Sequence, residues 1–379
     1  MKIKITYLAT VIASLILLFI GHKIAVQGLV VFQDQSRENV NAKVQRIIEK
    51  VTLYDDFSDF RHFDDIDSVL GEKIIFEARV TSGRLKGEVI IAEQAFSRFF
   101  QDTTKEVAQG DSVLLINSEI GWYFNGYRRI NKMIWLGLLF VLSVLFFGRK
   151  KGFNTILSLS LTCAAVFAVF IPSILSGKNI YLMALLVCAY TTVMTLTIVS
   201  GYNKKSLAAV IGCLSGIVAA GLITIIMDRI LLLTGIVDEH SRYLLNLPVP
   251  SPINLKAIIF AGIIIGAMGA IMDVAMSISS SLWEVKEKAG NIKFDALFRS
   301  GLNIGRDIMG TMANTLILAY IGSSLSVVLI LSVYSSSLME LFSREMIIVE
   351  ILQALAGSFG ILLAIPLTAF FSATLYLKK

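Results

Sequence analysis

The chain of 379 residues has little charge for its length. Asp, Glu, Lys and Arg make up only 16% of the residues, and hydrophobic residues make up 55%. In a typical soluble protein about a quarter of the residues are charged. The mean hydropathy of this chain is +0.74. This composition excludes an ordinary soluble protein and predicts that much of the folded surface faces lipid.

Cysteine and histidine are also scarce, at three residues each. The three cysteines, Cys163, Cys188 and Cys213, lie inside apolar runs, and neither a CxxC motif nor a Cys/His metal spacing occurs. Buried cysteines usually act as small hydrophobic residues. The aspartates between residues 55 and 67 lack the spacing of an EF-hand loop, so we interpret them as a solvated linker rather than a calcium site. We expect no metal site and no cofactor.

The motifs of several enzyme classes are missing. There is no Walker loop, dinucleotide fingerprint, HExxH or GxSxG motif, which argues against an ATPase or a standard hydrolase. Asp273 and Ser277 have the spacing for an intramembrane base and nucleophile, but helical serines usually bond to their own backbone. We therefore expect no catalytic residues and no enzymatic activity.

Long apolar runs dominate the chain instead. About 20 residues are needed to cross a bilayer, and eight runs approach or exceed this length. They lie at 5–20, 133–147, 153–175, 180–200, 207–233, 255–279, 308–334 and 346–377. We predict a membrane α-helical bundle of about eight transmembrane helices. The first run could be a cleaved signal peptide, which would leave seven helices, but no clear small-x-small site follows it, so we favour a signal anchor at residues 1–20.

The loops between these runs predict the orientation. If the helices alternate strictly, most Lys and Arg residues fall on one side, at residues 2–4, 149–151, 204–205, 286–306 and 378–379. The positive-inside rule then places both termini in the cytoplasm. The rule also accounts for the net charge of +6, so we expect no nucleic acid partner.

Residues 21–131 contain the only long stretch of ordinary polar composition. Short β-rich segments at 74–80, 88–92 and 112–117 are separated by glycine-containing turns, a pattern typical of strands. We expect a small extracytoplasmic β-rich domain here, and an OB-like barrel fits. Residues 132–379 then form a transmembrane domain of about seven helices.

Ionisable residues within the apolar runs indicate the functional site. In the run 255–279, small and polar residues recur every three or four positions and so share one helix face: Gly262, Gly266, Gly269, Asp273 and Ser277. Small residues at this spacing let helices pack closely in lipid. An isolated charge at the bilayer centre costs about 3 kcal/mol. We therefore expect this face to be buried against a neighbouring helix.

The next helix repeats the pattern and supplies the expected neighbour. It carries Asn303, Asp307, Gly310 and Asn314, with Arg306 beside them. We predict a polar pocket between these two helices, with Arg306 pairing with Asp273 or Asp307. Asp228, near the outer end of an earlier helix, is a secondary candidate for a gate; an interfacial pair with Arg229 is the simpler interpretation.

Two segments of this region resemble the YibE/F family of bacterial multi-pass membrane proteins. They are GAMGAIMDVAMSISSS at 266–281 and RSGLNIGRDIMGTMANTLILAYIG at 299–322. The resemblance extends to TSGRLKGE and QGDSVLL in the β-rich domain, and it implies an eight-helix or similar bundle with an extracytoplasmic β domain. The resemblance does not indicate a substrate. A weaker similarity links the same helices to resistance-nodulation-division permeases and to SecD and SecF, which use proton flow through intramembrane carboxylates but are built from six-helix units.

The functional expectation combines these observations. We expect a transporter or export factor of the bacterial plasma membrane that is proton-coupled, with Asp273 as proton or cation acceptor and Arg306 as its charge partner. The expected partners are the lipid bilayer and a second copy of the chain or a related membrane subunit. The alternative is an assembly or scaffold protein whose outer domain binds a partner. Transport predicts a water-filled path to Asp273, whereas a scaffold predicts a dry, fully paired charge cluster.

Overall fold

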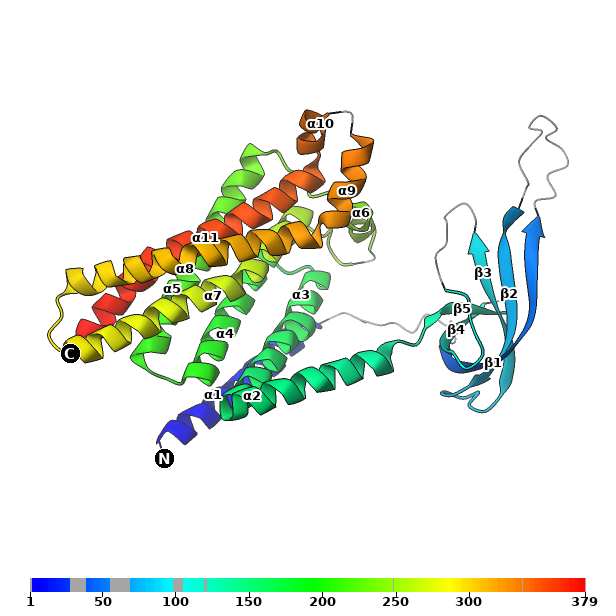
Figure 1. Ribbon diagram of the computed structural model, residues 1–379, viewed down its shortest axis with the longest axis horizontal. Helices are drawn as coiled ribbons and strands as arrows, with labels where there is room; N and C mark the ends of the chain where they lie inside the picture. Colours follow the sequence, from blue (N-terminus) through cyan, green and yellow to red (C-terminus); the bar gives the residue numbers. More distant parts are fainter. Residues whose placement is uncertain are drawn as a thin grey trace. The chain divides into compact units, whose positions relative to one another are not determined.

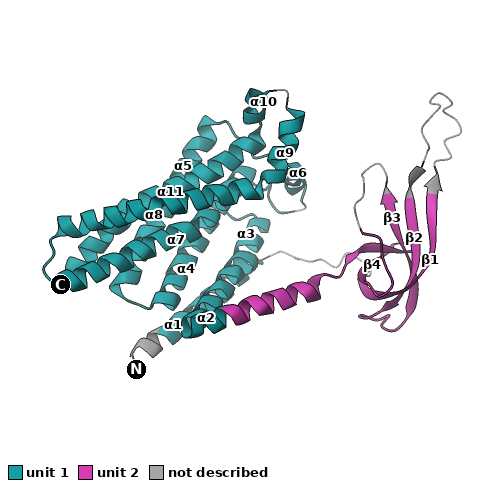
Figure 2. Ribbon diagram, in the orientation of Figure 1, with its two compact units in different colours: residues 1–31, 144–379 teal, residues 32–143 magenta. Residues whose placement is uncertain are grey.

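The structure is a computed structural model, and it describes residues 2–27, 39–54, 69–97, 105–118, 121–247, 249–335 and 337–378. The acidic segment at 55–67 lies outside these residues. The chain divides into two compact units (Figure 2), one formed by residues 1–31 and 144–379 and the other by residues 32–143. We call them the membrane unit and the barrel unit.

The barrel unit contains five strands that close on themselves (Figure 1). They are β1 Asn39–Tyr54, β2 Val69–Val80, β3 Val89–Ser97, β4 Ser112–Ser118 and β5 Gly121–Tyr127. Their order around the barrel is β1-β2-β3-β5-β4, and every pair is antiparallel except β3 with β5. Strand β1 closes the barrel by pairing with β2 from Ala42 to Tyr54 and with β4 from Asn39 to Lys43. Register shifts in its pairing with β2 are of the kind that bends a strand.

Alternation of side chains along the strands fills this barrel. On β2, Ile74, Phe76 and Ala78 are buried, whereas Glu77 faces outward and accepts a hydrogen bond from Arg46 Nε at 2.8 Å. This is the period of two that a half-buried strand requires. The expected β-rich domain is confirmed, and its three predicted segments correspond to β2, β3 and β4. Strands β1 and β5 were not predicted.

The membrane unit is helical. Helix α2 begins in the barrel unit and continues into the membrane unit. The helices are α1 Lys2–Ala25, α2 Ile130–Ala164, the π-helix η2 Ala165–Phe170, α3 Ile171–Leu175, α4 Ile180–Ser200, α5 Lys204–Ile230, α6 Glu239–Leu245, α7 Leu255–Ala289, α8 Phe294–Ser323, α9 Leu325–Tyr334, α10 Leu338–Ser343 and α11 Glu345–Leu377.

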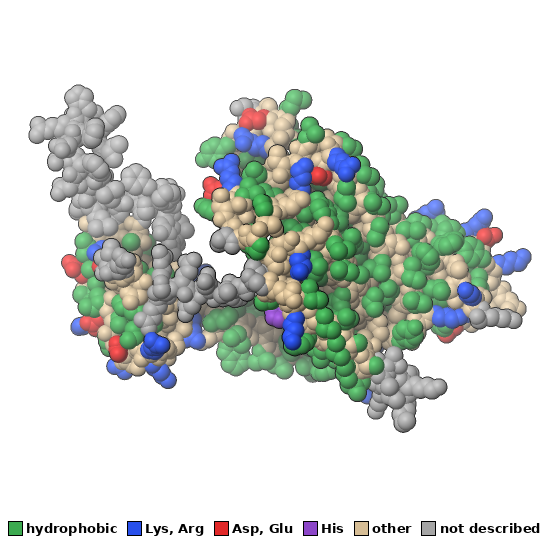
Figure 3. Space-filling model, turned by 180° about the vertical axis from the view of Figure 1, so that it is seen from behind, with side chains coloured by type: hydrophobic (Ala, Val, Ile, Leu, Met, Phe, Trp, Pro, Cys, Tyr) green, Lys and Arg blue, Asp and Glu red, His purple; other side chains and the backbone are tan. Residues whose placement is uncertain are grey.

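Among the described residues, six helical segments are long and apolar enough to cross a membrane, and the bent pair α8–α9 makes up to seven. One of the six, Ile130–Leu175, has 46 residues, about twice what one crossing needs. Its helix is interrupted at Arg149, whose φ of 47° is not helical. Hydrophobic side chains cover most of the visible face of the membrane unit (Figure 3), and Lys and Arg gather at the end where α7 and α8 meet. The chain is therefore a multi-pass membrane protein.

Small residues bring α5, α7, α8 and α11 close together. A Cβ added at Gly216 on α5 would lie 2.9 Å from the carbonyl oxygen of Gly360 on α11, and one at Gly305 on α8 would lie 2.2 Å from Ile365 Cγ2. Such close approach is what small residues permit in lipid. Helix α11 consequently lies against α5, α7 and α8 (Figure 1).

Helix α8 differs from its predicted extent. The sequence predicts a membrane-spanning run from 308 to 334, but α8 starts at Phe294, well before that run. Leu297 is fully buried, and a Cβ at Gly301 would contact Ala369 of α11 at 2.7 Å. Packing against α11 therefore holds the polar residues before 308 in the same helix. At the other end, α8 and α9 meet at a bend of 60°.

Candidate functional site

Helix α7 has two different faces. Its apolar face is completely buried in the bundle and includes Ile263, Ala267, Ile271, Val274 and Ile278. The opposite face carries residues that are spaced one helical turn apart and that remain exposed within the chain. We call this exposed face the α7 stripe, formed by Gly262, Gly266, Gly269, Asp273 and Ser277.

The α7 stripe is not packed in the expected way. A Cβ added at Gly262, Gly269 or Gly310 would meet no atom of the described chain within 4 Å. Only Gly266 touches a neighbouring helix, with its added Cβ 2.6 Å from the hydroxyl of Tyr320 on α8. Within the described chain, Gly262 and Gly269 on α7 and Gly310 on α8 therefore pack against no neighbouring helix, and their packing against another chain stays a prediction. The apolar face of α7 already fills the bundle, and the close helix contacts use glycines of α5, α8 and α11 instead.

Asp273 has no hydrogen bond or ion pair with any residue that the structure describes. Its expected partner Arg306 donates from Nη1 to Asn303 Oδ1 at 3.4 Å, one turn away on the same helix. Asn303, Arg306, Asp307 and Asn314 are all on the exposed side of α8. The polar residues thus lie on the outer sides of α7 and α8, and no closed pocket with an Arg306–Asp273 pair forms among the described residues.

The antiparallel packing of the two helices explains why this pair is absent. Gly266 of α7 lies beside Tyr320 of α8, and Leu282 lies beside Gly301 near the other end. With a rise of about 1.5 Å per residue, Asp273 is about 10 Å along α7 from the Gly266–Tyr320 contact, whereas Arg306 is about 21 Å along α8 from it. An axial offset of about 10 Å separates the two side chains.

Asp228 pairs with a different residue from the one the sequence favoured. Its carboxylate lies 3.6 Å from Lys256 Nζ, which connects α5 to the start of α7. Both side chains are partly exposed, and ion pairs of this kind contribute at most about 1 kcal/mol. This contact supports the interpretation of Asp228 as an interfacial pair, with Lys256 rather than Arg229 as its partner.

One buried polar cluster has no counterpart in the predicted site. Ser279 Oγ donates to the backbone oxygen of Lys205 at 2.7 Å and lies 2.5 Å from Tyr376 Oη, and the Tyr376 hydroxyl also donates to Ser279 O at 2.9 Å. Both side chains are almost completely buried. The cluster joins the start of α5, the middle of α7 and the end of α11. No spacing in the sequence predicts it, because its three parts lie far apart along the chain.

A second intramembrane carboxylate was also overlooked. Glu350 is the only acidic residue in the apolar run 346–377, and that isolation was a usable signal. It lines a cavity of about 200 Å³ beside the α8–α9 bend, together with Tyr320 and Ser324. Tyr320 Oη and Ser324 Oγ are buried and have no hydrogen-bond partner among the described residues.

Within the described part of the chain, no group of three or more His, Cys, Asp or Glu residues is arranged to hold a metal ion. Cys188 and Cys213 are buried, and Cys163 is exposed on α2. The site that remains is a set of polar and small residues on the exposed faces of two apolar helices.

Comparison with known proteins agrees with the motifs on these helices. No curated protein and no solved structure matches the chain. The family described as YibE/F-like protein matches residues 136–378. The match includes both quoted motifs and all helices from within α2 to α11, but it does not include the barrel strands, to which the sequence resemblance had been extended. The chain belongs to the YibE/F-like family of proteins.

Proposed function

We propose that the protein is a transporter or export factor of the bacterial plasma membrane in which Asp273 accepts and releases a proton or another cation. The observation that carries this proposal is the isolation of Asp273 in the apolar helix α7. A charge facing lipid at this depth costs about 3 kcal/mol, and residues of this kind normally face water or a partner. A purely structural carboxylate would be paired within the chain, as Asp228 is with Lys256.

The residues on α8 extend the polar surface toward the basic end of the bundle. Asn303, Arg306, Asp307 and Asn314 are exposed there, and they provide hydrogen-bonding and charged groups along a route past Asp273. We assign them to that route.

The open space beside Gly262, Gly269 and Gly310 supports a further element of the proposal. A second copy of the chain, or a related membrane subunit, covers the α7 stripe and encloses the route. This arrangement shields Asp273 from lipid without requiring a partner inside the chain. Glycines that pack no helix of their own chain allow close contact with another.

The proposed topology has eight crossings, both termini in the cytoplasm and the barrel outside. The interruption at Arg149 supports a division of Ile130–Leu175 into two crossings, with the basic residues 149–151 between them. The five-stranded closed barrel supports an OB-like type. Reporter fusions at Ser82 and Lys204 should give opposite signals.

The competing function is a scaffold that assembles with other membrane proteins and transports nothing. The uncovered α7 stripe is the observation that favours a scaffold, because the same surface would serve as a dry interface with another membrane protein. The two functions differ in whether water reaches Ser277 and Asp273.

Cysteine accessibility distinguishes them. In a variant without the three native cysteines, we would introduce Ser277→Cys and, as a matched control, Leu222→Cys, whose native side chain is 56% exposed on the apolar helix α5. A membrane-impermeant maleimide should label Ser277→Cys in intact membranes and leave Leu222→Cys unlabelled. Protection of both positions would contradict a water-filled route and favour the scaffold.

A hydrophobic carbodiimide tests the chemistry of the carboxylate, because it modifies protonated carboxyl groups in apolar surroundings. Modification should be lost in Asp273→Asn and retained in Asp228→Asn, and it should decrease as pH rises. Glu350 also lies in apolar surroundings, so the modified residue would be located by peptide mass spectrometry. A wild type that carries no modification at Asp273 at any pH would contradict the role given to Asp273.

A further inference from the structure

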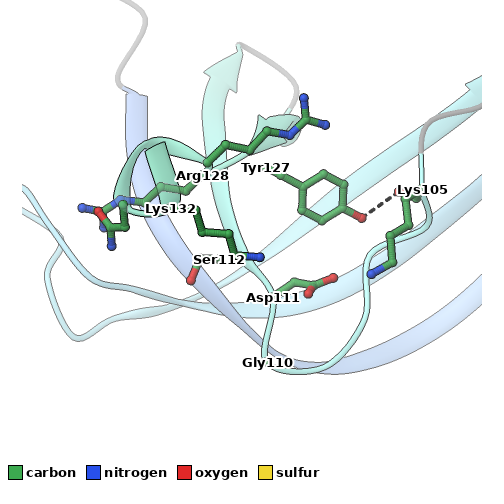
Figure 4. A pocket seen from close by; sticks show the side chains of 9 residues that line it. Lys105, Gly110, Asp111, Ser112, Tyr127, Arg128 and Lys132 are labelled. Atoms are coloured by element: carbon green, nitrogen blue, oxygen red, sulfur yellow. Dashed lines mark hydrogen bonds between the residues drawn. The ribbon is translucent and has the colours of Figure 1, made fainter. Parts of the chain in front are cut away.

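A cavity of about 430 Å³ lies in the barrel unit beside the start of α2. Basic side chains dominate its lining. Four of its nine residues are Lys105, Arg128, Arg129 and Lys132, and the only carboxylate is Asp111. Figure 4 shows Lys105 and Lys132 on opposite sides of Asp111. This volume is in the range of small-ligand sites.

Backbone hydrogen bonds hold the walls of this cavity in place. The β4–β5 ladder pairs Val113 with Tyr127 and continues with a bond from Arg128 N to Ser112 O at 2.9 Å. Tyr127 Oη donates to the backbone oxygen of Lys105 at 2.6 Å, which fastens the segment leading into β4 (Figure 4). Burial raises the pKa of Tyr127, so its hydroxyl keeps the proton for this bond. The cavity is therefore a feature of the fold, formed at the end of two paired strands.

The acidic residues nearby do not neutralise the basic ones. Asp111 Oδ2 accepts a hydrogen bond from Ala108 N at 2.9 Å, which closes the turn before β4. Glu106 pairs with Lys50. Among the described residues, no carboxylate lies within ion-pair distance of Lys105, Arg128, Arg129 or Lys132. Like charges held together repel each other, so a cluster of this composition is best satisfied by a bound anion.

The cavity also adjoins a helix surface suited to lipid. Helix α2 starts at Ile130, and its first turns expose Ile134 (61%), Trp135 (70%) and Leu139 (62%). Apolar residues exposed around a helix are typical of a surface in hydrocarbon, with Trp near the interface. Arg128, Arg129 and Lys132 thus lie at the level of lipid headgroups. The positive-inside rule concerns basic residues on the cytoplasmic side. With the barrel outside, as proposed, the rule does not account for these three basic residues.

We propose that this basic cavity binds a phosphate-bearing anion, either the phosphodiester of an anionic lipid headgroup or a free phosphate. Arg128 and Arg129 contact the phosphate oxygens through their planar guanidinium groups, which suit this geometry, and Lys105 and Lys132 contribute point charges. The first backbone N–H groups of α2 also favour an anion at this position. The site is independent of Asp273 and of the transport proposal.

The test compares two variants that remove the same charges. Arg129→Gln/Lys132→Gln alters the cavity, and Arg84→Gln/Lys86→Gln alters an exposed turn between β2 and β3. Full-length proteins in neutral detergent would be titrated with phosphatidylglycerol, with phosphatidylcholine and, separately, with inorganic phosphate, and binding would be measured by native mass spectrometry. Circular dichroism would verify that both variants fold.

The wild type and the turn variant should bind phosphatidylglycerol more tightly than phosphatidylcholine, and the cavity variant should bind it about 30-fold more weakly. If inorganic phosphate shows the same dependence and phosphatidylglycerol does not, the site takes a free phosphate. Equal weakening in both variants, or the absence of binding by either ligand to the wild type, would overturn the proposal.

Discussion

The packing of α5 against α7 and α11 leads to a sharp prediction about Gly216. A Cβ at this position would lie 2.8 Å from both Ala364 Cβ and Ile271 Cγ2, and 2.9 Å from Gly360 O. Carbon atoms at optimal contact are about 3.5–4.0 Å apart. Gly216→Ala therefore requires α5 to move by about 0.7 Å or more away from two helices at once.

The magnitude follows from two opposing effects. Overpacking of this kind costs about 1–3 kcal/mol, and contact with a backbone oxygen places Gly216→Ala near the upper end. Replacing glycine by alanine inside a helix recovers up to about 1 kcal/mol. The expected net loss is about 1–2 kcal/mol.

Gly137 on α2 provides the matched control. A Cβ there would meet nothing within 4 Å, so Gly137→Ala should retain only the helix-propensity gain of up to about 1 kcal/mol. Denaturant unfolding in mild detergent, followed by far-ultraviolet circular dichroism, measures both variants. Gly216→Ala at least as stable as Gly137→Ala would refute the reasoning.

A double-mutant cycle sharpens the test. A Cβ on Gly360 would lie 2.8 Å from Ile271 Cδ1 and 3.2 Å from Gly216 O, so the two glycines share one contact. Once α5 has moved for the first alanine, the second costs less. The combined loss should be smaller than the sum of the single losses, as is usual for residues that share a contact.

Three further predictions concern other parts of the fold. Tyr376→Phe removes the hydroxyl that donates to Ser279 O and should cost about 1–2 kcal/mol in the same unfolding assay; an unchanged midpoint would show that the buried cluster is dispensable. Hydrogen bonds from Ser241 lower the pKa of Asp238, so the stabilising effect of its carboxylate as the α6 cap is complete above the unfolded pKa of about 4 and disappears as pH falls through the folded pKa; Asp238→Ala should cost about 1 kcal/mol at pH 7 and progressively less as the pH is lowered below about 4, which unfolding over a series of pH values measures. Arg149 has a φ of 47° and ψ of −121°, a conformation that costs a non-glycine residue about 1–3 kcal/mol; Arg149→Gly should raise the unfolding midpoint, and a decrease would mean that the arginine side chain stabilises the break.

The sequence was sufficient for features that depend on local pattern. Apolar runs identified the membrane helices, and alternation with glycine turns identified β2, β3 and β4. It missed β1, whose pairing with β2 includes register shifts such as that between Val44 and Arg46. Periodicity cannot reveal such shifts, because an extra residue in one strand of a pair depends on the partner strand and leaves no fixed pattern in the sequence.

The sequence was sufficient to assign the candidate residues to helices but not to predict which residues they contact. Periodicity showed that Gly269 and Asp273 share a face, as they do in the structure. It could not show which face of α7 enters the bundle, because Ile271 and Val274 also recur at helical spacing. The large apolar residues occupy the interior, and the small-residue face is left outside. The pairing of Asp228 with Lys256 instead of Arg229 likewise depends on how α5 meets α7.

The barrel closes through a very short seam between β3 and β5. Among the residues that the structure describes, only Ala92 with Trp122 and Glu93 with Tyr123 pair there, whereas β2 and β3 pair continuously from Gly71–Ser97 to Arg79–Val89. Local opening begins where the fewest backbone bonds must break. Successive N–H groups of a strand point to opposite edges, and Trp122 and Tyr123 also pair with β4. The one of these two amide hydrogens that points to β3 should therefore exchange with solvent deuterium before those that β2 donates to β3. A barrel that opens between one pair of strands can widen while its other strand pairs stay intact, so the barrel unit can change the shape of its interior without unfolding.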